Sequence, residues 1–248
     1  SHRIGPRAPQ AAVGAAAWAP QRDSVGPQPS LDETLDAATR GRLDACLDDG
    51  RAGLEVLVGE AARAEPRMLQ RLRAALGGLR APDRCADPVV LRRYPPEAVG
   101  TTPEAAALRR IVARIGMLVF IGAFAEADAA LRAADSAAAA QSPALQALVD
   151  MAAADLAYHR GDMPVARARL VAAHDRAGGA GLDEIAAEAA IFLVDVDGFY
   201  LAQPEDGFGW LRLAEMWLTR MGSGPDDDRR GSLLVTHGKL LKATGDLA

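Results

Sequence analysis

Small turn-forming residues recur at intervals of about forty residues through the C-terminal part of the chain. They are Gly122, Gly161, Ala202 and Gly245, separated by 39, 41 and 43 residues. Each follows a stretch in which apolar residues return with the spacing of one helix face. A sustained period of this size is typical of proteins built from repeated helix pairs. We therefore expect each unit to consist of a helix, a tight turn and a second helix.

A second regularity lies inside each predicted second helix. A small residue follows the turn residue by five positions, with Leu four positions and Ala seven positions further on. The three sets are Ala127, Leu131 and Ala134; Ala166, Leu170 and Ala173; and Gly207, Leu211 and Ala214. Residues with this spacing share one helix face. We expect the small residue to let the paired helices approach, while Leu and Ala fill the seam between them.

The composition favours helices over strands. Half of the residues are hydrophobic, but only 4% are aromatic, so Ala, Leu and Val dominate the apolar side chains. Ala and Leu are strong helix formers because they lose little side-chain freedom in a helix. Short β-branched or aromatic runs between turn residues, the usual mark of strands, are nearly absent. The sequence predicts an all-α protein.

The N-terminal part is predicted to contain a linker and a helical hairpin. Residues 1–30 are rich in Pro, Ala, Gln and Gly without a helical period, which predicts a flexible linker. Ser30 followed by Glu33 has the spacing of a capping box, so a hairpin over 31–82 is expected to begin there. Pro66 suits the first turn of its second helix.

A proline-rich connector over 83–102 is expected to separate the hairpin from the repeats. The repeat region, 103–248, holds about 3.5 units, and its last unit is truncated at Ala248 where another helix should begin. The chain also starts with Ser1 rather than Met and carries no signal-peptide pattern. We therefore expect it to be a piece of a longer protein.

The two cysteines, Cys46 and Cys85, fall in the hairpin region. With a rise of about 1.5 Å per residue, an antiparallel hairpin turning near residue 64 places both at similar heights. This geometry permits a disulfide, which would suit an extracytoplasmic region. The alternative is a pair of separate thiols in a reducing cytosol.

The units at 108–141, 147–181, 188–224 and 228–248 resemble tetratricopeptide repeats. Gly161-Asp162-Met163-Pro164-Val165-Ala166 and Gly245-Asp246-Leu247-Ala248 match that family's turn pattern best. The spacing exceeds the family's usual length of about 34 residues. The third unit has Pro204 and Gly207 where Tyr and Ala are usual. The resemblance implies a degenerate α-solenoid of antiparallel helix pairs.

In such solenoids the first helix of each unit lines a concave face that captures a partner segment. Steps of three and four residues along each predicted first helix give one face per unit. Val119 lies on the face of the first unit and Val196 on that of the third. The predicted partner-binding groove carries Phe120, Met151, Tyr158, His159, Phe192, Phe199 and Tyr200. The alternative for each is packing between helices as core.

A longer resemblance covers about residues 35 to 248. The order Ala45-Cys46-Leu47-Asp48, a Leu-rich helix, Cys85-Ala86-Asp87 and then repeats is similar to the C-terminal sensor region of large serine/threonine protein kinases of myxobacteria and their relatives. Gly198-Phe199-Tyr200 also resembles that family's repeats. The resemblance implies a kinase domain upstream, often behind a linker and a membrane span. It fits a cytoplasmic or an extracytoplasmic position in a membrane-anchored bacterial protein.

Several other classes of function have no support in the sequence. A net charge of -5 argues against nucleic-acid binding, which needs a basic surface. No apolar window is long enough to predict membrane contact. Phosphate-binding loops, kinase motifs and recognisable catalytic pairs are absent from the sequence. Asp155 and His159 are spaced for a surface hydrogen bond, and Asp195-Val196-Asp197-Gly198 lacks the later ligands of a calcium loop, so no metal or cofactor is expected.

We therefore expect a non-catalytic module for protein–protein interaction or sensing, with a protein or peptide partner. One alternative is the helical effector region of a transcriptional regulator, which also uses such arrays. Others are a free-standing tetratricopeptide adaptor and an enzyme with an unrecognised site on a helical scaffold.

Overall fold

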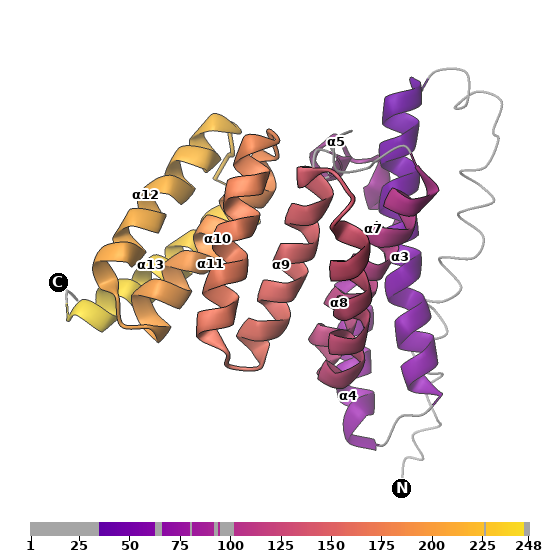
Figure 1. Cartoon of the computed structure of the whole chain (residues 1–248), viewed down its shortest axis with the longest axis horizontal. Helices are drawn as coiled ribbons and strands as arrows, with labels where there is room; N and C mark the ends of the chain where they lie inside the picture. Colours follow the sequence, from indigo (N-terminus) through magenta and orange to yellow (C-terminus); the bar gives the residue numbers. More distant parts are fainter. Residues whose placement is uncertain are drawn as a thin grey trace, which may run out of the picture.

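The computed structural model describes residues 35–62, 66–79, 81–91, 94, 102–225 and 227–245. All regular structure in these residues is helical, which confirms the predicted all-α class. The helices follow one another across the molecule from α3 at one end to α12 and α13 at the other (Figure 1). They are α3 (Ala37–Ala61), α4 (Pro66–Gly78), the 3-10 helix η1 (Pro82–Ala86), α5 (Pro88–Leu91), α7 (Pro103–Ile121), α8 (Phe124–Ala138), α9 (Pro143–His159), α10 (Met163–Gly179), α11 (Asp183–Asp195), the π-helix η2 (Val196–Tyr200), α12 (Pro204–Arg220) and α13 (Asp228–Thr244).

The four recurring turn residues all lie at or just after a helix end. Gly122, Gly161 and Gly245 have φ angles of 79°, 80° and 78°, and Ala202 has φ 53°. Positive φ is the left-handed conformation that ends many helices, and glycine adopts it without a Cβ clash. Ala202 is the single non-glycine residue with positive φ in the described part of the chain. The recurrence in the sequence therefore marks a backbone requirement.

The predicted seams are buried between paired helices. Ala127 and Ala134 on α8, Ala166 and Ala173 on α10, and Ala214 on α12 are fully buried. Consecutive helices pack on one another from α7 to α13, and α7 and α9, α9 and α11, and α11 and α13 are also in contact. The small side chains thus lie buried within the packed helices.

The N-terminal hairpin, formed by α3 and α4, shares a hydrophobic core with the helices that follow. Val56 of α3 and Leu72 of α4 belong to the same buried cluster as Leu108 and Ile115 of α7. Both helices pack against α7. The hairpin is therefore continuous with the helical array.

The ends of the predicted hairpin differ in part from expectation. The linker at 1–30 and the capping box of Ser30 and Glu33 lie outside the described residues. Helix α3 begins at Ala37, and the Asp36 side chain caps it by accepting a hydrogen bond from the Thr39 backbone at 2.9 Å. The predicted connector over 83–102 contains α5 and all of η1 except its first residue, Pro82, and Pro82 and Pro88 each occupy the first turn of a short helix.

The third unit has a close backbone contact, which explains why glycine stands at position 207. Helix α11 ends in the π-helix η2, where the Leu201 N–H donates to the Val196 carbonyl five residues earlier at 2.9 Å. A Cβ built on Gly207 of α12 would stand 2.7 Å from the Gly198 Cα of η2. Ala at position 207 would force one of the two backbones to shift, so glycine is the residue that fits this crossing without strain.

Gly207→Ala is expected to lower the free energy of unfolding by about 1–3 kcal/mol, since the new methyl group must displace backbone. Gly209→Ala is a matched control on the same helix, because a Cβ there meets no atom within 4 Å. The control should be neutral or stabilising by up to about 1 kcal/mol through helix propensity. Urea unfolding of both variants measures the difference. Equal stability of the two variants would contradict the close-contact explanation.

Candidate binding surface

Five of the predicted groove residues meet in one group, here called the aromatic cluster: Tyr158, His159, Phe192, Phe199 and Tyr200. The Tyr158 ring is edge-on to the rings of His159, Phe192 and Tyr200, at centroid distances of 5.6, 5.7 and 5.5 Å. Phe199 and Tyr200 form a fourth edge-on pair at 5.2 Å. Edge-to-face geometry is the favoured arrangement of aromatic pairs. The cluster joins the end of α9 to α11 and η2.

The cluster is partly exposed and partly supported by core. Phe199 and Tyr200 are 42% and 45% exposed, and His159 is also exposed. Tyr158 and Phe192 are half-buried and pack against a core group that includes Leu170 and Leu193. The structure therefore assigns some of these residues to the exposed surface and others to packing between helices. The outer three present side chains to solvent, and Tyr158 connects two of them, His159 and Tyr200, to Phe192 and the core.

The other residues predicted on this face have different surroundings. Met151 is half-buried and packs against the same core group as Tyr158. Val119 and Val196 are buried, so for both of them the alternative of packing between helices as core holds. Phe120 is 58% exposed, but it lies beside Gly78 of α4, and no ring contact in the described residues joins it to the aromatic cluster. A helix wheel places residues on a side of one helix without showing what the neighbouring helices cover.

Asp195 forms a polar centre beneath the aromatic cluster. Its Oδ2 accepts hydrogen bonds from the Tyr158 hydroxyl at 2.6 Å and from the Lys239 ammonium at 2.9 Å. The Asp195 side chain is only 5% exposed, whereas Lys239 is 39% exposed. Burial and the hydrogen bond to Asp195 raise the pKa of the Tyr158 phenol, so the phenol remains a hydrogen-bond donor. This centre connects α9, α11 and α13.

Asp155 and His159 form the second polar pair beside the rings. The His159 Nδ1 lies 2.9 Å from the Asp155 carbonyl oxygen and 3.2 Å from its Oδ1. Burial raises the pKa of the Asp155 carboxyl, and the neighbouring His159 opposes the shift. Such a pair supplies two ligands at most, and no group of three or more metal-binding side chains occurs among the described residues.

Sequence reasoning missed the buried carboxylate of Asp197. The Asp197 side chain is fully buried and accepts hydrogen bonds from the Arg167 Nε at 2.8 Å and the Trp210 indole N–H at 2.9 Å. It therefore links η2 to α10 and α12. The signal in the sequence was the presence of two Asp residues, Asp195 and Asp197, in an otherwise apolar helical run. Buried carboxylates in such a run require partners from other helices.

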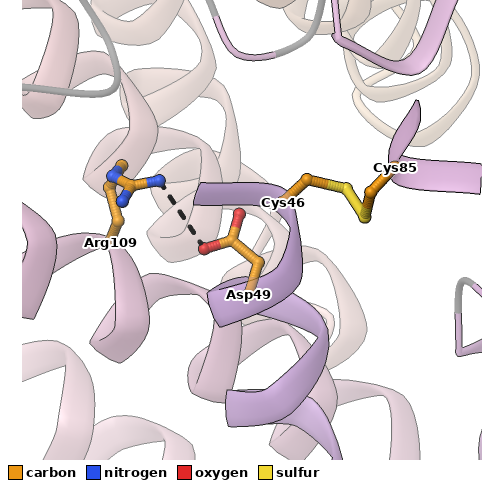
Figure 2. The surroundings of a disulfide bond; sticks show 4 residues. All are labelled: Cys46, Asp49, Cys85 and Arg109. Atoms are coloured by element: carbon orange, nitrogen blue, oxygen red, sulfur yellow. Dashed lines mark ion pairs between the residues drawn. A yellow bond between two sulfur atoms is a disulfide. The ribbon is translucent and has the colours of Figure 1, made fainter. Parts of the chain in front are cut away.

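The structure joins Cys46 and Cys85 in a disulfide with a Cα–Cα distance of 5.7 Å. Figure 2 shows the bond connecting α3 to η1, with Asp49 on the next turn of α3 facing Arg109 of α7. The Arg109 Nη1 lies 4.0 Å from the Asp49 Oδ1. Both sulfurs are buried, together with Leu47 and Val90. The cross-link therefore supports the end of the molecule remote from α12 and α13.

Comparison with known proteins identifies no relative. No protein-family model matches the chain, and neither a curated protein nor a solved structure matches it. No helix in the described residues is sufficiently long and apolar to cross a membrane.

Proposed function

We propose that residues 103–248 form a degenerate tetratricopeptide-like α-solenoid that binds a protein or peptide partner through the aromatic cluster. Two features support this proposal: the contacts between successive first helices and the recurring left-handed turns. In a solenoid of this type the first helices line the binding face. The aromatic cluster lies on two of these helices, α9 and α11 with its η2 extension.

The aromatic cluster carries the proposal. Aromatic residues make up only 4% of the chain, yet Phe192 and Tyr200 both pack edge-on to Tyr158, and Phe199 packs on Tyr200. Binding energy at protein interfaces concentrates in such aromatic side chains, because they bury a large area with little loss of conformational freedom. The half-buried Tyr158 and Phe192 hold Phe199 and Tyr200 in place before a partner arrives. This preorganisation favours binding of an apolar side chain from an extended or helical segment.

The proposed biological context is a non-catalytic sensor region of a bacterial serine/threonine protein kinase. This context rests on the sequence resemblance over residues 35 to 248. Partner binding would change the position or dimerisation of a kinase domain encoded upstream. The reading frame in the source genome tests the context: an upstream kinase domain supports it, and a DNA-binding domain instead would favour a transcriptional regulator.

Selection of phage-displayed peptides on the immobilised chain tests the binding surface. We expect enriched peptides to bind the Phe199→Ser/Tyr200→Ser variant at least about tenfold more weakly, which corresponds to about 1.4 kcal/mol. The matched control is Leu213→Ser/Met216→Ser on α12, where the two side chains are 37% and 43% exposed. This control removes a similar exposed apolar surface on a second helix and should leave the affinity unchanged.

Two results would contradict the proposal. One is the absence of any enriched peptide sequence after selection on folded protein. The other is equal weakening by the cluster variant and the α12 control, because this would show adhesion to any exposed apolar surface. Circular dichroism of all three proteins must show the same helix content, since both pairs of substitutions are on the surface.

A further inference from the structure

Helices α10 and α12, the second helices of adjacent units, are bridged by long side chains. Within the described residues, no Cα atom of α10 lies within 8 Å of one in α12. His174 of α10 is edge-on to the rings of both Trp210 and Trp217 of α12, at 5.2 and 5.9 Å. The Trp217 indole N–H donates a hydrogen bond to the His174 Nε2 at 3.1 Å. The His174 ring therefore occupies the gap between the two helices.

The partners of His174 determine its protonation state. An indole N–H is only a donor, so the His174 Nε2 must be an unprotonated acceptor. The His174 Nδ1 lies 3.0 Å from the Asp175 Oδ1, and a carboxylate only accepts, so Nδ1 carries the proton. The bridge therefore contains neutral His174 in one tautomer. A second proton on Nε2 would place two N–H groups against each other and break the bond to Trp217.

The charges around this bridge are largely paired with one another. Arg220 of α12 lies over the Trp217 ring at 5.4 Å and pairs with Asp183 of α11. Asp150 of α9 pairs with Arg169 and Arg176 of α10, and Asp197 of η2 pairs with Arg167. Asp175 is the carboxylate that directly faces His174, and its side chain is 70% exposed. It can keep its contact with His174 in either protonation state.

We infer that His174 and Trp217 form a pH-sensitive latch between adjacent helical units. Neutral His174 holds α10 to α12 through the indole hydrogen bond. Protonation of Nε2 releases the Trp217 N–H and weakens the direct bridge between the two second helices, which stay joined through Asp197. The first helices α9 and α11 of the same units carry the aromatic cluster. The latch operates whether or not that cluster binds a partner.

Nuclear magnetic resonance of the indole N–H groups in the full chain tests the latch. The chain has three tryptophans, Trp18, Trp210 and Trp217, so three assigned signals are followed from about pH 8 to about pH 5, across the usual range of imidazole titration. We expect the Trp217 N–H signal to move as the pH falls, and its solvent exchange, corrected for the intrinsic pH dependence, to rise by about tenfold. The Trp210 N–H, bound to Asp197, should not follow this transition.

The His174→Gln variant separates the latch from a merely structural role. The Gln amide oxygen accepts a hydrogen bond but does not titrate in this range, so the Trp217 response should disappear while the fold persists. His237→Gln is the control, because His237 contacts Phe208 and should leave the response intact. An unchanged Trp217 signal while His174 titrates would overturn the latch. A His174 ring that stays neutral to pH 5, or the same response in His174→Gln, would overturn it equally.

Discussion

Reduction of the Cys46–Cys85 disulfide is expected to lower the free energy of unfolding by about 4 kcal/mol, the chain-entropy value for a closed loop of about 40 residues. The two cysteines are separated by 39 positions. Without the bond, η1 and α5 are held mainly by a small buried group that includes Leu47 and Val90. Helices of five and four residues do not persist without such support. We therefore expect η1, α5 and the part of α3 around Cys46 to loosen first.

Urea unfolding followed by circular dichroism, with and without a phosphine reductant, measures this effect. The chain has two cysteines, so the reductant acts on this bond alone. The Cys46→Ala/Cys85→Ala variant should unfold at the lower urea concentration of the reduced protein. It should also be insensitive to the reductant. Coincident unfolding curves for oxidised and reduced protein would show that the cross-link does not stabilise the fold.

Replacement of Asp197 is expected to have the second largest effect, a loss of about 3 kcal/mol for Asp197→Ala. The substitution leaves the Trp210 indole N–H in the interior without its acceptor and removes the counter-charge of Arg167. Arg167 is 40% exposed and can turn toward water, which keeps the loss at the lower end of the range for buried pairs. Asp197→Asn should be less damaging, because its amide oxygen still accepts from Trp210.

Asp128 provides the matched control for Asp197. It also contacts two arginines, Arg132 and Arg160, but its side chain is 40% exposed. Exposed ion pairs contribute about 0–1 kcal/mol, so Asp128→Ala should be nearly neutral. Urea unfolding of both variants at neutral pH gives the comparison. If Asp128→Ala and Asp197→Ala lose the same stability, burial of the Asp197 network is not what stabilises η2.

The sequence predicted the helical pairs well because their signals are local and repeated. The turn at Gly161 and the seam formed by Ala166, Leu170 and Ala173 lie within a few turns of one another. Their recurrence in neighbouring units distinguishes them from chance in an Ala-rich chain. The hairpin's second helix was also predicted from a local signal, because Pro66 marks its first turn.

The candidate surface was predicted only in part. Helical spacing placed Tyr158, Phe192 and Tyr200 on comparable faces, and the structure brings their rings together. The same spacing placed Val196 on that face, although it is buried, and grouped Phe120 with rings that it does not contact. Periodicity within one helix gives direction around its own axis. It does not give the rotation and offset of the neighbouring helix.

The sequence by itself determined the all-α class, the four recurring turns at Gly122, Gly161, Ala202 and Gly245, and the small residues at the helix seams. These features depend on backbone sterics and on side-chain spacing within a single helix. Only the tertiary structure decided the partners of the buried polar groups. Asp195 accepts hydrogen bonds from Tyr158 and Lys239, and Asp197 accepts them from Arg167 and Trp210. His174 accepts a hydrogen bond from Trp217. The partners in the Lys239–Asp195 and Trp217–His174 pairs are 44 and 43 positions apart. Their contact requires the register between packed helices, which the close approach at Gly198 and Gly207 helps to set.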